Sequence, residues 1–126
     1  MITITAFGGM ADNIVDELPI EFFRKLNGGV IISETAKLHA QSRPEAPLYV
    51  LGEYCTSNLG KSIMLYYGSF IATYPHLVGS EAKARLREVI LHEFRHHLEY
   101  LSGTNELEKD DAVRLAQYKS KYGGNS

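Results

Sequence analysis

Near the N-terminus, apolar residues recur with the three- and four-residue spacing of one buried helix face. The positions are Phe7, Met10, Ala11, Ile14, Val15 and Leu18. They predict a helix over about residues 5–18, with Thr5 available as its N-cap. Gly8 and Gly9 weaken the first turn, and the alternating sequence ITIT at 2–5 would also suit a short strand. The start of this helix therefore stays open.

The next segment combines helix-terminating residues with a short apolar run. Pro19 suits the first position of a short helix, PIEFFRKL at 19–26, which the Asn-Gly pair at 27–28 then ends. The sequence VIIS at 30–33 is apolar and β-branched, and it predicts a strand.

Two further apolar runs predict a β-hairpin. They are LYVLGEY at 48–54 and SIMLYYGSF at 62–70, and they flank the turn sequence TSNLG at 56–60. The preceding SRPEAP at 42–47 is typical of a loop. Together with the strand at 30–33, the hairpin predicts a small sheet of about three strands.

The C-terminal part of the chain predicts two helices. A long helix spans 80–101, Gly103 stands where a helix terminator is expected, and a last helix runs from 106 to about 121. At 126 residues, 44% hydrophobic and 22% charged, the chain fits one globular domain over 1–126. The fold class predicted is α+β.

Charge and composition exclude several partners and sites. The net charge of −2 and the interspersed basic residues disfavour nucleic acid and anionic membranes. The N-terminus lacks a secretory pattern, and no stretch reaches about 18 consecutive apolar residues, so we expect a cytoplasmic protein. Cys55 is the only cysteine, which rules out an internal disulfide and a thiolate-rich zinc site. Any bound metal would have nitrogen and oxygen ligands.

The long helix carries an unusual set of polar residues. At about 100° per residue, His92 and His96 fall side by side on a polar face, opposite Leu86 and Ile90. A solvated helix face would explain the two histidines without a metal. It would not explain Glu93, which falls beside the apolar residues, because a glutamate is rarely buried without a partner.

The sequence HEFRH at 92–96 matches the pattern HExxH. Two histidines one helical turn apart can direct imidazole nitrogens at one zinc ion at about 2.0 to 2.1 Å, and the adjacent glutamate reaches the water bound to that ion. Chance matches to so short a pattern occur, but this one lies within a helix, after a small sheet, and before a run of acidic residues. We therefore expect zinc.

The segment HEFRHHLEYLSGTNELEKDD at 92–111 resembles the active-site signature of small bacterial zincin-like metallopeptidases of the minimal-zincin type. In that signature His-Glu-x-x-His-His-Leu-Glu is followed by a glycine and then by an acid-Leu-Glu segment, and the likeness extends through ELP, LNGGV, LYVLGEY and YYGSF. The resemblance implies N-terminal helices, a small mixed sheet, the HExxH helix and a closing helix. It also implies peptide-bond hydrolysis, with His92 and His96 as zinc ligands and Glu93 as general base.

The third zinc ligand is expected from the segment after the helix. The extended pattern HExxHxxGxxH or HExxHxxGxxD does not match. Glu99 stands where the pattern has glycine, and Ser102 stands where it has the final histidine or aspartate. In a compressed gluzincin-like arrangement, an acid of the next helix comes back to the metal. Glu106 best matches the acid before Leu-Glu, and Glu108 is the next candidate.

Other roles remain open for the neighbouring acidic residues. Glu108 could form a capping box with Asn105, Asp110 and Asp111 could favour the helix dipole, and Glu106 could be a first-turn acid. Glu99 is expected either to orient the ligand His96 through a contact with its imidazole or to form a salt bridge to Arg95. His97 points away from the proposed ion, as a satisfied core or interface histidine. His39 and His76 fall in predicted loops and are not expected to be ligands.

The predicted reaction is hydrolysis of a peptide or unfolded protein by water that zinc and Glu93 activate. Tyr66, Tyr67 and Tyr100 are unranked candidates to assist the oxyanion, and the substrate is expected to add along the edge of the strand IMLYYGSF at 63–70. Two alternatives remain: a catalytically silent zinc domain that binds a peptide or protein partner, and a metal-free interaction protein. Oligomeric state is not predicted.

Overall fold

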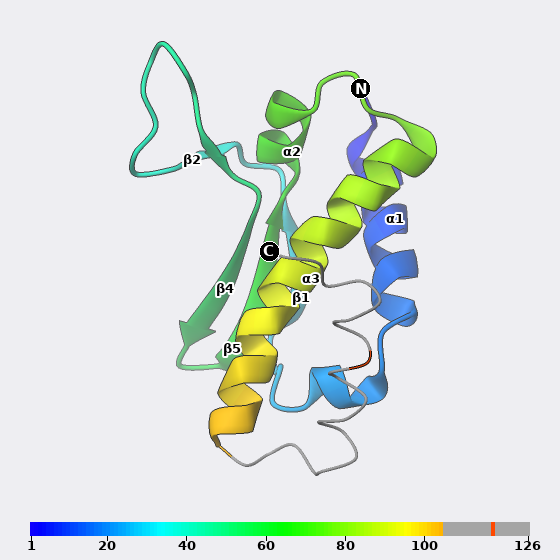
Figure 1. Cartoon of the computed structure of the whole chain (residues 1–126), viewed down its shortest axis with the longest axis vertical. Coiled ribbons are helices and arrows are strands. Elements are labelled where there is room, and N and C mark those ends of the chain that lie inside the picture. The colour runs from blue at the N-terminus through cyan, green and yellow to red at the C-terminus, as the bar shows by residue number, and fades with distance from the viewer. Residues whose placement is uncertain (105–116, 118–126) are drawn as a thin grey trace.

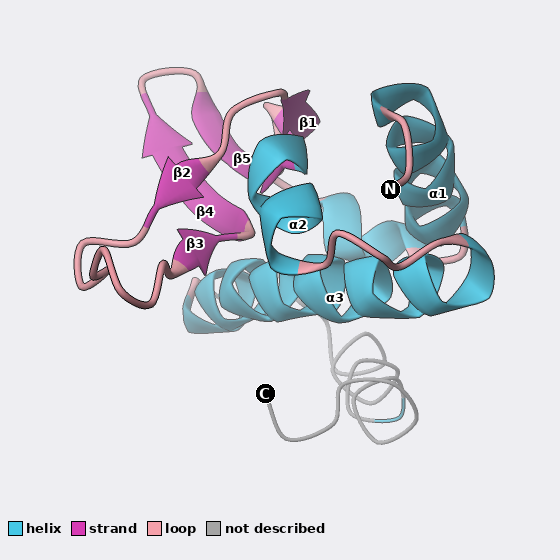
Figure 2. Cartoon of the chain, turned by 90° about the horizontal axis from the view of Figure 1, so that it is seen from above, coloured by secondary structure: helices cyan, strands magenta, loops and turns pink. Residues whose placement is uncertain are grey.

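The computed structural model describes residues 1–104 and residue 117. In this part, two short sheets lie beside three α-helices and one 3-10 helix, η1 (Figures 1 and 2). The elements in chain order are α1 (Ile4–Asp16), η1 (Ile20–Phe23), β1 (Gly29–Ser33), β2 (Lys37–Leu38), β3 (Tyr49–Val50), β4 (Gly52–Ser57), β5 (Gly60–Tyr66), α2 (Tyr67–Thr73) and α3 (Gly79–Gly103). Among these residues, no helix is both long and apolar enough to cross a membrane.

Helix α1 confirms the N-terminal helix but begins one residue earlier than predicted. Its N-cap is Thr3, whose Oγ1 accepts a hydrogen bond from the backbone N–H of Ala6 at 3.1 Å. The expected cap, Thr5, lies inside the first turn, and the alternative of an N-terminal strand is wrong. A cap at Thr3 satisfies a backbone donor of the first turn, which a strand at these positions would not need.

The second predicted helix, 19–26, is only a 3-10 turn. Pro19 precedes this turn as its N-cap, and the helix stops because Arg24 takes an extended ψ of 131° and Lys25 a left-handed φ of 62°. Phe22 is buried, so packing of one aromatic ring fixes the turn while the backbone leaves helical geometry at once. The sequence pattern indicated the turn but overestimated its length.

The main sheet has the strand order β1-β5-β4 and is mixed, as predicted. β1 runs parallel to β5, and β4 and β5 form the predicted antiparallel hairpin, whose two-residue turn lies between Ser57 and Gly60. Gly60 has a φ of 113°, which a residue with a side chain rarely adopts. The predicted strand 30–33 is confirmed as β1.

Three details of the predicted strands are wrong. The run 48–54 is divided, because Tyr49–Val50 pairs with β2 in a separate two-stranded sheet and β4 begins at Gly52. The run 62–70 ends as a strand at Tyr66, and α2 follows it directly. β5 is also the central strand, so the substrate edge expected along IMLYYGSF is already occupied on both sides.

Gly68 explains why the chain turns into α2 at this point. A Cβ on Gly68 would lie 2.6 Å from the backbone nitrogen of Ala36 and from the carbonyl oxygen of Glu34. The buried hydroxyl of Ser69 also accepts a hydrogen bond from the backbone N–H of Lys37 at 2.8 Å. These contacts with residues 34–37, which lead into and begin β2, are long-range, so strand propensity alone does not reveal them.

One apolar core lies between the sheet and the helices α1 and α3. Ile63 and Leu65 of β5 are fully buried, and α3 runs the length of the molecule against both the sheet and α1 (Figures 1 and 2). Edge-on aromatic contacts of Phe7 with Phe70 and of Phe23 with Phe94 fill the two ends, at centroid distances of 5.3 Å each. The HExxH helix is therefore held by the core along its whole length.

Candidate metal and catalytic site

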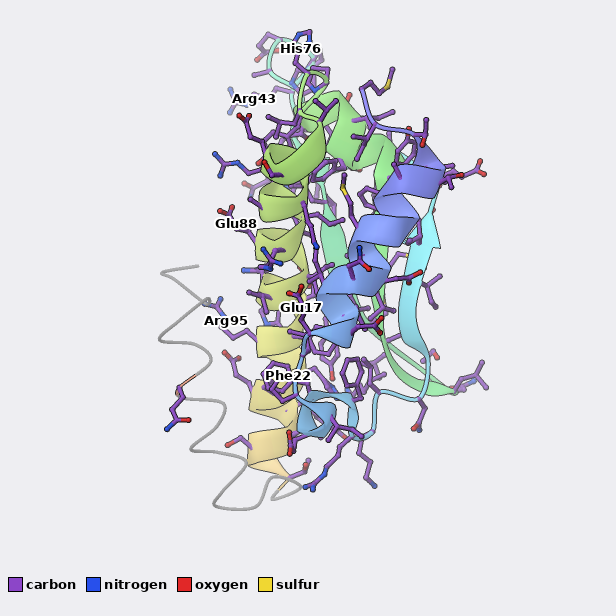
Figure 3. All side chains as sticks on the ribbon, turned by 90° about the vertical axis from the view of Figure 1, so that its right-hand side faces the viewer. Glu17, Phe22, Arg43, His76, Glu88 and Arg95 are labelled. Carbon is purple, nitrogen blue, oxygen red and sulfur yellow. The ribbon has the colours of Figure 1, made fainter. Side chains whose placement is uncertain are left out.

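Helix α3 confirms the predicted long helix and carries the whole HExxH motif. His92 is half-buried and His96 is exposed, and their rings lie 5.1 Å apart between centroids at an interplanar angle of 86°. Their positions one turn apart leave both imidazoles on one side of the helix. Figure 3 shows Glu88 and Arg95, on the same helix, pointing outward from α3 and away from α1.

Glu93 lies under strand β4 and is only 7% exposed. A Cβ on Gly52 would come within 2.9 Å of Val89 Cγ1 and 3.1 Å of Glu93 Cγ, so a glycine lets the strand approach the glutamate closely. The backbone N–H of Tyr54 donates a hydrogen bond to the Glu93 carboxylate. Loss of hydration on burial nevertheless raises the pKa of Glu93, and the nearby charge of Glu53 raises it further.

The environment of His92 favours the neutral imidazole. Burial lowers the pKa of His92, and the positive charge of Arg95 acts in the same direction. A neutral imidazole has a lone pair free for a metal ion, whereas imidazolium has none. The charge state of His92 therefore suits ligation.

Two adjoining cavities open beside the motif, and we call them together the cleft. One, of about 340 Å³, is lined by residues that include His92, and the other, of about 590 Å³, by residues that include His96. Both cavities are lined by Glu93 on α3 and by Gly52 on β4. The three motif residues thus share one open space, at the side of the sheet where β4 forms the edge.

His97 points away from the cleft, as expected, and is completely buried. Its Nε2 donates to the carbonyl oxygen of Arg24 at 2.6 Å, so Nδ1 accepts from the hydroxyl of Tyr54 at 2.7 Å. Burial lowers the pKa of His97. The ring therefore ties α3 to β4 and to the segment after η1, and it is a satisfied core histidine.

Glu99 is exposed and takes one of its two expected roles. Its Oε1 lies 3.8 Å from Nε of Arg95, an i,i+4 ion pair. The predicted third ligand, Glu106, and the next candidate, Glu108, lie outside the described residues, as do Asp110 and Asp111. Within residues 1–104 and 117, no group of three His, Cys, Asp or Glu side chains comes together around one point.

The tyrosines named as oxyanion candidates are engaged in other contacts. The hydroxyl of Tyr66 donates to Glu53 Oε1 at 2.7 Å, and that of Tyr67 donates to the carbonyl oxygen of Ile2 at 2.6 Å. The ring of Tyr100 stacks on His97 at a centroid distance of 6.1 Å. Each of these contacts directs the side chain to a partner on another element or to the core.

Gly52 and Tyr54 of β4 line the cleft, although the sequence analysis did not single them out. His39, which was considered only as a ligand and not expected to be one, lines the cleft from the segment after β2. His39 is in a loop, as predicted. A glycine within an otherwise apolar and aromatic strand pattern was the available signal, since such a glycine often marks a close approach by another group.

A charged cluster borders the same edge. Lys37 Nζ lies 2.9 and 2.8 Å from the two oxygens of Glu53, which also accepts from Tyr66. These hydrogen bonds, that of Lys37 first, lower the pKa of Glu53 despite its partial burial. Glu53 is therefore a carboxylate in the cleft wall whose charge has a fixed partner.

Comparison with known proteins identifies a solved relative. A conserved hypothetical protein from Thermus thermophilus is 34% identical in sequence and superimposes with a TM-score of 0.65, over 81% of this chain and 99% of that one. No protein-family model and no curated protein matches the chain. Identity at this level over nearly the whole relative means that the chain belongs to the same family as this conserved hypothetical protein.

Proposed function

We propose that this protein is a zinc-dependent peptidase of the minimal-zincin type. The observation that carries the proposal is the placement of Glu93, a buried carboxylate with a raised pKa that opens into a cleft between two histidines of the same helix. A solvated polar helix face would leave the glutamate in water, and this one is 7% exposed. A buried acid in a cleft, with a pKa shifted by desolvation, is typical of a catalytic group.

The donor set suits zinc. His92 and His96 would supply two imidazole nitrogens, and we propose Glu106 as the third ligand, with Glu108 as the next candidate. Zinc held by two imidazoles and one carboxylate would keep a position open for water, whose pKa it would lower far below the ordinary value, and it would polarise a carbonyl group. The half-buried, neutral His92 fits this role.

Glu93 would carry the proton. Its carboxylate removes a proton from the attacking water and then delivers it to the nitrogen of the leaving amine. The raised pKa of Glu93 brings this acid closer to neutral pH, which favours both halves of the transfer. Glu93 lines both cavities of the cleft, so its carboxylate is within reach of a water molecule bound there.

An extended peptide is the substrate that the sheet geometry suits best. Among the described residues β4 is an edge strand of the main sheet and lines the cleft through Gly52 and Tyr54, so a substrate strand could pair with its outer edge beside Glu93. An unfolded protein segment or a small peptide fits such an edge. With Cys55 as its only cysteine the protein needs no oxidising compartment, and we place it in the cytoplasm.

Zinc stoichiometry and peptide turnover test the proposal in two steps. Equilibrium dialysis should find one tight zinc in the wild type, lost in Glu106→Ala and kept in Glu99→Ala, its matched acidic control. Glu93→Gln should keep the zinc and lose hydrolysis of a peptide library. Zinc without turnover, with peptide binding unaffected by Glu93→Gln, would indicate a silent binding domain, and no zinc in the wild type would refute the proposal.

A further inference from the structure

His39 belongs to the segment after β2. This segment forms the wall of the cleft that faces the motif on α3. His39 lines both cavities of the cleft, and Glu93 lines both as well. His39 lines the smaller cavity together with His92, and it lines the larger cavity together with His96. The four residues that the cavities share are Glu93, His39, Val50 and Gly52. Among the described residues outside α3, His39 is therefore the polar side chain that lines both cavities, and it faces the same space as His92, Glu93 and His96.

Hydrogen bonds fix the ring and the backbone of His39. The backbone N–H of Gln41 donates to Nδ1 at 3.0 Å, and the backbone N–H of His39 donates to the carbonyl oxygen of Leu48 at 2.8 Å. The backbone N–H of Ser42 also donates to the carbonyl oxygen of His39, at 2.9 Å. The loop therefore holds this histidine in place, although its side chain is exposed.

The contact with Gln41 determines which ring nitrogen bears the proton. A nitrogen that accepts a hydrogen bond has no proton of its own, so the neutral ring of His39 carries its proton on Nε2. A protonated Nε2 is a hydrogen-bond donor and offers no lone pair to a metal ion. His39 is thus suited to contact an oxygen atom in the cleft and not to be the missing zinc ligand.

We propose that His39 is a further catalytic residue, which donates a hydrogen bond from Nε2 to the carbonyl oxygen of the scissile peptide bond. This inference rests on the proposed peptidase function. When the water oxygen bonds to the carbonyl carbon, the π electron pair of the carbonyl moves onto its oxygen, and Nε2–H stabilises the negative charge there. The proton remains on His39, while the proton of the water passes separately to Glu93.

Steady-state kinetics on a cleaved library peptide test the role of His39. With the zinc-loaded protein, His39→Ala should lower kcat by roughly 10²- to 10³-fold, the usual effect of losing one such donor, and change KM less. His39→Gln keeps an N–H donor and should recover part of the rate. His76→Ala is the matched control, because His76 is another exposed loop histidine and lines neither cavity (Figure 3). Its kcat should equal that of the wild type.

Two measurements that do not depend on turnover separate the possible failures. Zinc stoichiometry should be the same in His39→Ala and the wild type, and loss of zinc would make His39 a ligand and overturn the inference. Nitrogen-15 NMR of the metal-free protein should find the His39 proton on Nε2, and a proton on Nδ1 would overturn it too. An active wild type with an equally active His39→Ala refutes the inference alone, whereas a wild type without turnover refutes the peptidase proposal and this inference together.

Discussion

At the scale of single residues, Gly52 is the position where one added methyl group should disturb the site most directly. Its missing side chain allows β4 to approach Val89 and Glu93 closely. A Cβ at this position would lie 2.9 Å from Val89 Cγ1, a distance that requires a displacement, and 3.1 Å from Glu93 Cγ, which is tighter than most such contacts. Gly52→Ala should lower the free energy of unfolding by about 1 to 3 kcal/mol, the usual cost of overpacking. Denaturant unfolding, followed by circular dichroism, measures this change.

Gly9→Ala provides the opposite control for Gly52→Ala. Gly9 lies in α1, is exposed, and has no neighbouring atom within 4 Å of the position that a Cβ would take. Alanine at such a helix position should raise the free energy of unfolding by roughly 0.5 to 1 kcal/mol. If both variants shifted stability in the same direction, the close contact at Gly52 would not be the cause.

His97 should make stability depend on pH. Its folded pKa is lowered below the ordinary value of 6.5, so above about pH 6.5 the residue is neutral in both states and its stabilising effect is complete. As the pH falls below 6.5, the unfolded chain binds a proton that the folded chain does not, and stability declines through the folded pKa. The metal-free wild type should therefore lose stability between pH 7 and pH 5.

His97→Gln tests this assignment, since glutamine keeps hydrogen-bonding groups but does not titrate in this range. The variant should be less stable than the wild type at pH 7, by about 1 to 3 kcal/mol for imperfectly paired partners. The difference should shrink towards pH 5, as measured from urea midpoints. Any contribution from His92 is common to both proteins, so parallel pH curves would mean that His97 is not the titrating group.

At the scale of elements, the start of α1 separates a local prediction from the structure. Thr3, before the helix, and Thr5, inside its first turn, are both exposed, and the hydroxyl of Thr3 is the one that accepts from a helix backbone N–H. Thr3→Ala should destabilise the protein by about 0.5 to 2 kcal/mol, whereas Thr5→Ala should be neutral or slightly stabilising. Thermal unfolding of the two variants measures their stability. A larger loss of stability in Thr5→Ala than in Thr3→Ala would mean that Thr5 is the N-cap, as the sequence pattern predicted.

Elements with strong local signals were predicted well. The 3.6-residue period places α1 and α3 correctly to within a few residues, and the Asn-Leu turn before Gly60 identifies the β4–β5 hairpin. The errors occur where a distant segment decides the conformation. Strand-forming residues at 67–70 become α2 because Gly68 packs against the backbone before β2, and 48–54 is divided because part of it pairs with β2.

At the scale of the whole molecule, the proposed zinc should stabilise the folded state. A ligand that binds only the folded chain adds RT ln(1 + [L]/Kd), or about 2.7 kcal/mol at a free zinc concentration of a hundred times Kd. The wild type and Glu93→Gln should both unfold at higher denaturant concentration with zinc than with a chelator. His96→Ala, which removes an exposed side chain outside the core, should fold normally and lose this zinc dependence.

Equal zinc-induced shifts in the wild type and His96→Ala would contradict the proposed site. Such a result would place the metal on other residues, and it could be checked with His39→Ala and His76→Ala. Because the chelator measurement gives each variant its own metal-free reference, a general loss of stability in His96→Ala would not affect the comparison.

The sequence by itself determined the local features of this protein: the amphipathic helices, the hairpin, and the presence of His92, Glu93 and His96 on one helix. These depend on spacing along the chain, where 3.6 residues per turn suffices to bring side chains together. The tertiary structure alone decided which strand is central, how Gly52 buries Glu93, and that His39 faces the motif. Those features join segments far apart in sequence, and their geometry follows from packing and hydrogen bonding across the core, which no local pattern encodes.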